Sequence, residues 1–238
     1  MTSLKESNAY QSWGRTLRAK HYVFKALNRD QAWEALRLAA EQGSTLLGFG
    51  LGRSYGDSNL NTDGILYVSQ GLDRFISFDR TTGIIRAEAG VSLSDILSIV
   101  VPHGFFLPTT PGSCFVTLGG AVANDVHGKN HHHAGSFGNS VTKIGLVRSD
   151  RGELELSPDT EPELFAATIG GLGLTGLINW VEFQLVPVSS SFLDEQSMIF
   201  KNCDEFFDME ADHRDQFEHT VSWIDCTARG NTLGRGFF

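Results

Sequence analysis

Cysteine is scarce in this sequence, and long hydrophobic runs are absent. The three cysteines, Cys114, Cys203 and Cys226, are odd in number and widely spaced, which argues against a disulfide framework and favours a reducing compartment. No apolar run reaches the roughly 18 residues of a membrane-spanning helix, and the amino terminus has no apolar segment of the signal-peptide type. We therefore expect a soluble protein of the cytoplasm.

Positive charge is also in short supply. The chain of 238 residues carries 19 Lys and Arg against 28 Asp and Glu, a formal net charge of −9, and no basic cluster interrupts this balance. A nucleic-acid-binding surface is therefore not expected, and a phosphate-bearing ligand must be held by backbone amides and single cations. With 41% hydrophobic residues, the chain can bury the core of one large or two small domains.

The first glycine-rich segment runs from Gly48 to Ser58 and follows a predicted strand. Its G-x-G-x-G spacing differs from the G-x-G-x-x-G fingerprint of Rossmann domains, and no helix is predicted for residues 59–64. Glycine lets the backbone approach an anion closely and present its amides. The segment therefore predicts an anion-binding loop between two strands, and an irregular hairpin is the purely structural alternative.

Residues 108–139 are rich in glycine, histidine and asparagine and contain only two charged side chains, Asp125 and Lys129. The pattern fits neither one amphipathic helix nor a strand. We interpret this stretch as a polar, loop-rich surface that combines an anion site with a reactive centre.

Hydrophobic periodicity predicts alternating helices and strands over most of the chain. Helices are expected at residues 31–42, 92–102, 161–168 and 203–213, and strands at 22–27, 44–47, 65–69, 75–78, 84–89, 141–149, 152–156, 177–188, 192–200 and 220–227. The strands at 65–69, 75–78 and 84–89 are expected to form one small mixed sheet. The predicted fold class is α+β.

A shift in composition at Pro187 and the serines that follow it predicts a domain boundary near Val188. Residues 1–188 are expected to form the first domain, with subdomains at about 20–100 and 101–188. Residues 189–238 are expected to be the incomplete beginning of a second domain.

Four motifs carry a resemblance to a known family. They are GRSYGDS at Gly52–Ser58, PGS-x3-T-x-GGA at Pro111–Ala121, D-x-HGKNHHxAGSFGN at Asp125–Asn139 and GGxGLTGxI at Gly170–Ile178. Together they resemble the FAD-binding domain of flavoproteins of the vanillyl-alcohol-oxidase, or PCMH, type. Within that group they are most similar to the oxidase subunits of decaprenylphosphoryl-ribose 2-epimerase.

The resemblance implies a PCMH-type domain of two small α/β subdomains, followed by the start of a mixed α/β substrate domain. It implies FAD as the cofactor and oxidation of the 2-hydroxyl of a polyprenyl-phosphoryl ribose, with a separate reductase as partner. It also implies a later segment that returns to the flavin, which the sequence does not contain. The implied cofactor-binding residues are Gly48, Phe49, Gly50, Leu51, Gly52, Arg53, Ser54, Tyr55, Gly56, Asp57, Ser58, Gly112, Thr117, Leu118, Gly119, Gly120, His127, Gly128, Lys129, Asn130 and Ile178.

His127 and Lys129 are the candidate catalytic residues. Oxidising a secondary alcohol requires a hydride acceptor, which flavin supplies, and an acceptor for the hydroxyl proton. Imidazole changes its charge near neutral pH, and a lysine can stabilise a substrate phosphate or a reduced flavin. The Gly48–Ser58 loop contains neither His nor Cys, so non-covalent FAD is predicted.

No metal site is predicted from the three consecutive histidines at 131–133, because consecutive side chains cannot all face one tetrahedral ion. We expect one of them to face the flavin or the substrate and the others to hydrogen-bond within the loop.

Two other functions stay open. One is a soluble polyol or aldonolactone oxidoreductase of the same fold, and the other is a module that binds FAD without turnover. A lipid-linked sugar as the substrate implies peripheral contact with the inner face of a membrane, whereas a soluble sugar does not.

Overall fold

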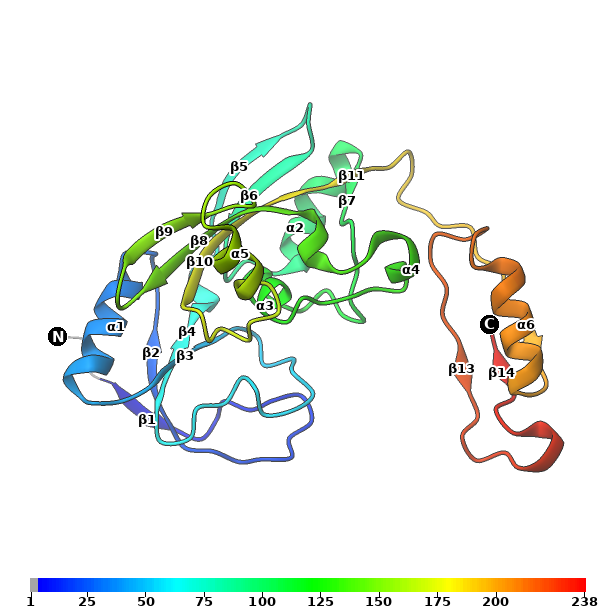
Figure 1. Cartoon of the computed structure of the whole chain (residues 1–238), viewed down its shortest axis with the longest axis horizontal. Helices are drawn as coiled ribbons and strands as arrows, with labels where there is room; N and C mark the ends of the chain where they lie inside the picture. Colours follow the sequence, from blue (N-terminus) through cyan, green and yellow to red (C-terminus); the bar gives the residue numbers. More distant parts are fainter. Residues whose placement is uncertain (1–3) are drawn as a thin grey trace.

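The computed structural model describes residues 4–238, in which a mixed sheet and an antiparallel sheet form the main body (Figure 1). The mixed sheet has the order β1-β2-β4-β3, and its strands are β1 (Lys5–Ser7), β2 (His21–Lys25), β3 (Leu46–Phe49) and β4 (Ile65–Val68). Strands β2, β4 and β3 are parallel, whereas β1 pairs with β2 in the antiparallel sense.

Helix α1 (Gln31–Glu41) makes the crossover from β2 to β3. It buries Ala32, Ala35 and Ala39, while Trp33 stays half exposed. Small side chains on the buried face let the helix lie close to the sheet. The helical period was therefore predicted correctly, but the largest apolar residue of the helix is not part of its packed face.

The antiparallel sheet has the order β5-β6-β10-β8-β9. Its strands are β5 (Phe75–Asp79), β6 (Ile84–Glu88), β8 (Val141–Arg148), β9 (Gly152–Leu156) and β10 (Leu177–Gln184). The predicted mixed sheet of residues 65–69, 75–78 and 84–89 is therefore wrong, because β4 belongs to the first sheet and β5 and β6 to the second. Residue 100 is therefore not the point at which one sheet ends and the other begins. Strand β6, which precedes that residue, pairs with β10, which follows it by more than seventy residues.

Short helices and 3-10 turns connect the strands, and some of the helices pack against the antiparallel sheet. They are α2 (Leu93–Val100), α3 (Leu118–Ala123), α4 (His131–Ala134) and α5 (Pro162–Thr168), with 3-10 turns η1 (Ser69–Gly71), η2 (Val101–His103) and η3 (Phe137–Ser140). Helix α2 begins with a capping box, in which Ser92 and Asp95 each accept from the other's backbone amide. Its buried Leu93, Ile96 and Val100 join the same core cluster as residues of β6 and β10.

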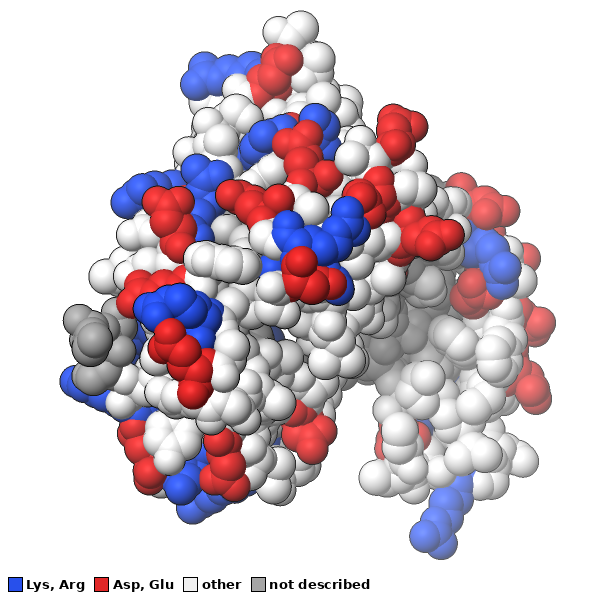
Figure 2. All heavy atoms as spheres, turned by 60° about the vertical axis from the view of Figure 1, so that its left-hand side comes forward, with Lys and Arg blue, Asp and Glu red and all other residues white. Residues whose placement is uncertain are grey.

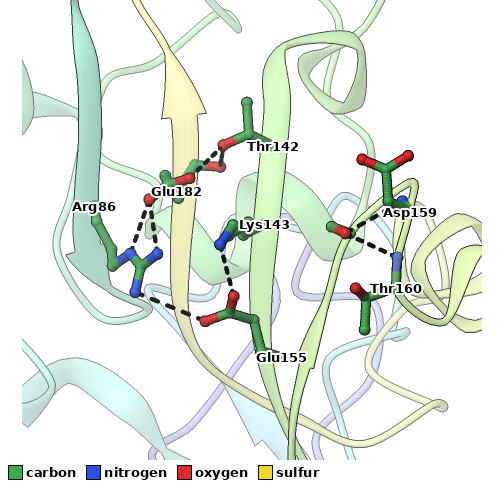
Figure 3. Close-up of polar contacts among 8 residues, drawn as sticks. Arg86, Thr142, Lys143, Glu155, Asp159, Thr160 and Glu182 are labelled. Atoms are coloured by element: carbon green, nitrogen blue, oxygen red, sulfur yellow. Dashed lines mark hydrogen bonds and ion pairs between the residues drawn. The ribbon is translucent and has the colours of Figure 1, made fainter.

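The polar face of the antiparallel sheet carries a charged network that links four strands (Figure 3). Arg86 on β6 binds Glu182 on β10 with an N–O distance of 2.8 Å, and Lys143 on β8 binds Glu155 on β9 at 2.7 Å. Arg86 also lies 4.2 Å from the centroid of the Trp180 ring. The Lys143–Glu155 pair is exposed and contributes little individually, whereas Arg86 and Glu182 are largely shielded from solvent.

Beyond β11 (Val186–Pro187), which pairs with β7 (Phe105–Phe106), the chain leaves the two sheets (Figure 1). It then forms β12 (Ile199–Phe200), α6 (Cys203–His213), β13 (Trp223–Ile224), η4 (Gly230–Thr232) and β14 (Gly236–Phe237). Helix α6 has its predicted bounds. The long strands predicted at 192–200 and 220–227 are wrong, because only two residues of each pair with β14.

The surface face shown in Figure 2 carries Lys and Arg side chains interspersed with Asp and Glu. None of the helices in residues 4–238 has both the length and the apolar character needed to cross a bilayer.

Candidate functional site

A cleft of about 520 Å³ is bordered by segments that leave both sheets. The loop after β3 forms one wall, the chain around α3 forms another, and the turn that precedes β10 contributes a third. The predicted cofactor-binding residues that line the cleft are Gly48, Phe49, Gly50, Leu51, Gly52, Arg53, Ser54, Tyr55, Ser58, Gly112, Thr117, Gly119, Gly120, His127 and Ile178. All three glycine-rich turns of the sequence therefore meet at one site.

The loop after β3 turns its carbonyls away and leaves its amides available. The Gly50 carbonyl accepts from the Gln70 side chain at 2.9 Å, and the Leu51 carbonyl accepts from the Arg53 guanidinium at 3.0 Å. The Ser54 carbonyl accepts from the Trp13 backbone amide at 2.9 Å. Within the described residues, none of the backbone amides from Leu51 to Gly56 donates a hydrogen bond to another protein group. Successive unpaired amides in one loop are the donor set that an anion requires.

Two kinds of glycine shape the cleft. At Gly50 a Cβ atom would lie 2.3 Å from Oγ1 of Thr117, the residue that caps α3, so this glycine permits the close approach of two walls. At Gly112 a Cβ atom would meet no protein atom within 4 Å, and at Gly48 it would meet only Leu177, at 3.8 Å. A side chain at either of these two positions would project into the space that a ligand needs.

His127 lies at the edge of the cleft, exposed to solvent, and its ring nitrogens have no hydrogen-bond partner within residues 4–238. The backbone of His127 pairs with that of Ser136. Asp125 holds this turn in place, because its carboxylate accepts from the Ser136 hydroxyl at 2.7 Å and from the Gly138 amide at 2.8 Å. The acidic residue of the motif therefore holds the turn that carries the histidine, whose ring lies edge-on to that of His131 with the centroids 6.0 Å apart.

Six predicted cofactor-binding residues do not line the cleft: Gly56, Asp57, Leu118, Gly128, Lys129 and Asn130. Leu118 lies in the core because α3 presents its Gly119 and Gly120 face to the cleft and Leu118 to the sheet. Gly56 and Asp57 lie exposed at the far end of the loop. The sequence prediction extended the contact surface over whole motifs, whereas only one face of each motif reaches the cleft.

Lys129 and Asn130 lie outside the cleft for a different reason. The chain turns at buried Gly128, where a Cβ atom would be 2.6 Å from the Thr110 carbonyl. Asn130 is then buried and donates to the Pro108 carbonyl at 2.8 Å. The Lys129 side chain is exposed, and its carbonyl accepts from the Thr220 amide at 3.0 Å. The structure thus separates the two candidate catalytic side chains, because only His127 borders the cleft.

The three consecutive histidines contact the loop and the carboxyl-terminal segment. His131 Nδ1 lies 3.1 Å from the Gly128 carbonyl, and the Nε2 atoms of His132 and His133 each lie 3.1 Å from the carbonyl of Arg214. None of the three lines the cleft, and the expectation that one of them faces the flavin or the substrate stays a prediction. Among the described residues, no group of three or more His, Cys, Asp or Glu side chains is arranged to hold a metal ion.

Sequence reasoning missed several polar side chains in the cleft, among them Asn59 and Tyr67. The amide oxygen and nitrogen of Asn59 and the hydroxyl of Tyr67 are buried without hydrogen-bond partners. Tyr67 lies in the apolar strand β4, where no sequence motif marks it as a site residue. Asn59 could have been found, because it directly follows the glycine-rich loop. Buried polar groups without partners are rare in folded proteins, so these atoms are candidates for ligand contacts.

A bulge in β10 shapes the cleft beside the third glycine-rich turn. The pairing of β10 with β8 shifts register between Ile178 and Trp180, which leaves Asn179 as the extra residue. The Asn179 carbonyl accepts from the Ala89 amide at 3.0 Å. Bulges of this kind redirect a neighbouring side chain, and here Ile178 borders the cleft.

The cleft fits a dinucleotide by its chemistry. It combines a loop of available amides, glycines that leave room for a ligand, apolar walls and buried polar groups without protein partners. A phosphate-bearing ligand with extended ring systems requires these features together.

These features define a dinucleotide-binding domain. A model of the FAD binding domain matches residues 21–157, so the chain belongs to the FAD-binding-domain family and FAD is its cofactor. The predicted α+β fold of the PCMH type is thereby confirmed.

Among similar proteins, decaprenylphosphoryl-beta-D-ribose oxidase of Mycolicibacterium smegmatis is 34% identical over 226 residues, which are 94% of this chain and 49% of the relative. L-gulonolactone oxidase of Mus musculus is 26% identical over 82% of this chain and 45% of its own. The structure of BBE-like 1 from Physcomitrella patens shares the fold with a TM-score of 0.70 and 20% identity, covering 76% of this chain and 40% of that protein. The chain thus spans about half the length of the first of these relatives.

Proposed function

We propose that the protein acts as an FAD-dependent oxidoreductase on a secondary hydroxyl of a sugar, with the 2-hydroxyl of a polyprenyl-phosphoryl pentose as the preferred substrate. The observation that carries this proposal is the free imidazole of His127 at the edge of a cleft whose glycine-rich loop presents unpaired amides. The similarity to decaprenylphosphoryl-beta-D-ribose oxidase over 94% of the chain supports the substrate class.

In this proposal the residues have distinct roles. Bound FAD supplies the hydride acceptor. A ring nitrogen of His127 takes the hydroxyl proton as the alcohol is oxidised, because the imidazole has no hydrogen-bond partner among residues 4–238 and His127 borders the cleft. Lys129 is exposed outside the cleft, two residues away in sequence, so its charge suits a substrate phosphate rather than the flavin.

Residues 189–238 are proposed to begin a substrate domain. They contact the loop that carries the candidate catalytic residues, through Thr220 to the Lys129 carbonyl and through Arg214 to His132 and His133. A reductase that completes an epimerisation and peripheral contact with a membrane are further proposals that follow from a lipid-linked substrate.

A soluble polyol or aldonolactone oxidoreductase is the second candidate, favoured by the similarity to L-gulonolactone oxidase. Stopped-flow measurement of flavin absorbance distinguishes the two. We expect a polyprenyl-phosphoryl pentose to bleach the flavin faster than an aldonolactone or a polyol at equal concentration, because only the phosphorylated substrate carries a charge that attracts the Lys129 ammonium. Faster bleaching by the lactone would favour the second candidate. A yellow protein bleached by neither class would be a binding module without turnover.

The flavin is expected to be released by acid precipitation. The loop Gly48–Ser58 contains no His or Cys that could tether it, so denaturation should leave FAD in the supernatant. Absorbance at the flavin maxima in pellet and supernatant measures this. Flavin that stays with the precipitated protein would contradict non-covalent binding and would direct attention to His127, which also borders the cleft.

A further inference from the structure

The floor of the cleft contains a buried phenol. Tyr67 lies opposite Gly48 in the parallel pairing of β3 and β4, and only 1% of its surface is exposed. Its ring stacks on that of Phe24 with the centroids 6.0 Å apart, and it belongs to the same core cluster as Leu177. The side chain is therefore held in one place by packing on the first sheet.

The hydroxyl of Tyr67 has no hydrogen-bond partner in the protein. The nearest charged group that influences it is Glu88, whose two carboxylate oxygens are already engaged by Arg29 at 3.2 Å and by the Arg74 amide at 3.1 Å. The side-chain oxygen of Asn179 is also buried without a partner, so this group does not satisfy the phenol either. Burial raises the pKa of the Tyr67 hydroxyl, with a smaller contribution from Glu88, and the group therefore stays a proton donor.

Leaving a buried donor unpaired destabilises a fold, and a phenylalanine would pack in the same place without that cost. Tyr67 is one of the residues that line the cleft in which the glycine-rich loop presents its amides, and its hydroxyl is the buried, unpartnered atom of that side chain. We propose that the Tyr67 hydroxyl donates a hydrogen bond to the bound dinucleotide and positions it from the floor of the cleft. This inference rests on FAD as the cofactor and adds a contact that lies outside all four glycine-rich motifs.

The test is Tyr67→Phe, measured as FAD affinity by quenching of flavin fluorescence in flavin-free protein. Loss of one neutral hydrogen bond should weaken FAD binding about fivefold, which corresponds to about 1 kcal/mol. The unfolding temperature of the flavin-free protein should be unchanged or about 2 °C higher, because an unsatisfied buried group has been removed. If the hydroxyl served only to stabilise the fold, its removal would instead lower the unfolding temperature of the flavin-free protein.

Tyr22→Phe is the matched control, because Tyr22 lies on the neighbouring strand β2 and does not line the cleft; its FAD affinity should equal that of the wild type. Titrations of the Tyr67→Phe variant with ADP and with riboflavin show which half of FAD the hydroxyl contacts. Only the probe that contains the contacted half should bind the variant more weakly than the wild type.

Equal FAD affinity of Tyr67→Phe and the wild type would overturn the inference alone and would mean that the hydroxyl meets only water. A lower unfolding temperature of the flavin-free variant would also overturn it. Absence of FAD binding by the wild type would overturn the cofactor assignment and, with it, this inference.

Discussion

Replacing His127 by alanine is expected to lower turnover by about 10²- to 10⁴-fold, the usual contribution of a positioned acid or base, while most of the flavin is retained. The reason is geometric: the imidazole lies exposed at the edge of the cleft, whereas the loop amides and glycines form its walls. Flavin content from the absorbance spectrum and the rate of flavin bleaching by substrate measure the two effects separately.

His103→Ala is the control for this variant. His103 is also exposed, but it lies on η2 and does not line the cleft, so its removal should change neither flavin content nor rate. Unchanged turnover in His127→Ala would refute the proposed role of the imidazole. Loss of flavin in parallel with loss of turnover would assign His127 to cofactor binding instead.

Replacing Gly50 by alanine is expected to weaken FAD binding. The new Cβ atom would lie 2.3 Å from Oγ1 of Thr117, and Thr117 cannot move freely because it is buried and its hydroxyl accepts from the Gly120 amide at 3.2 Å. The loop or the start of α3 must therefore shift, at a cost of about 1–3 kcal/mol. Because both segments line the cleft, FAD affinity should fall about 5- to 150-fold, as measured by fluorescence titration.

Gly56→Ala provides a control within the same loop. Gly56 lies outside the cleft lining, and a Cβ atom there would meet no protein atom within 4 Å. This variant should bind FAD as the wild type does. If Gly50→Ala bound FAD equally well, the close approach of the loop to Thr117 could not be essential for the cofactor site.

The glycine-rich turns were predictable because their requirements are local. An available amide or a missing Cβ depends on a few adjacent residues, so the spacing of Gly48, Gly50 and Gly52 already indicated an anion-binding loop. The capping box at Ser92 is local in the same sense. Which face of each motif borders the cleft depends on long-range packing and cannot be read from adjacent residues. For this reason Leu118 and Asn130 were assigned to the cofactor, although the fold buries both of them away from the cleft.

The sequence by itself determined the class of protein, because four motifs with unusual spacing specify the turns from which an FAD-binding domain is built. Only the tertiary structure decided how those turns meet. Pairing of β6 with β10 joins residues about a hundred positions apart and places β5 and β6 in the second sheet, which no local pattern reveals. The same long-range packing leaves His127 at the cleft, turns Lys129 away from it, and places the unpaired hydroxyl of Tyr67 in its floor.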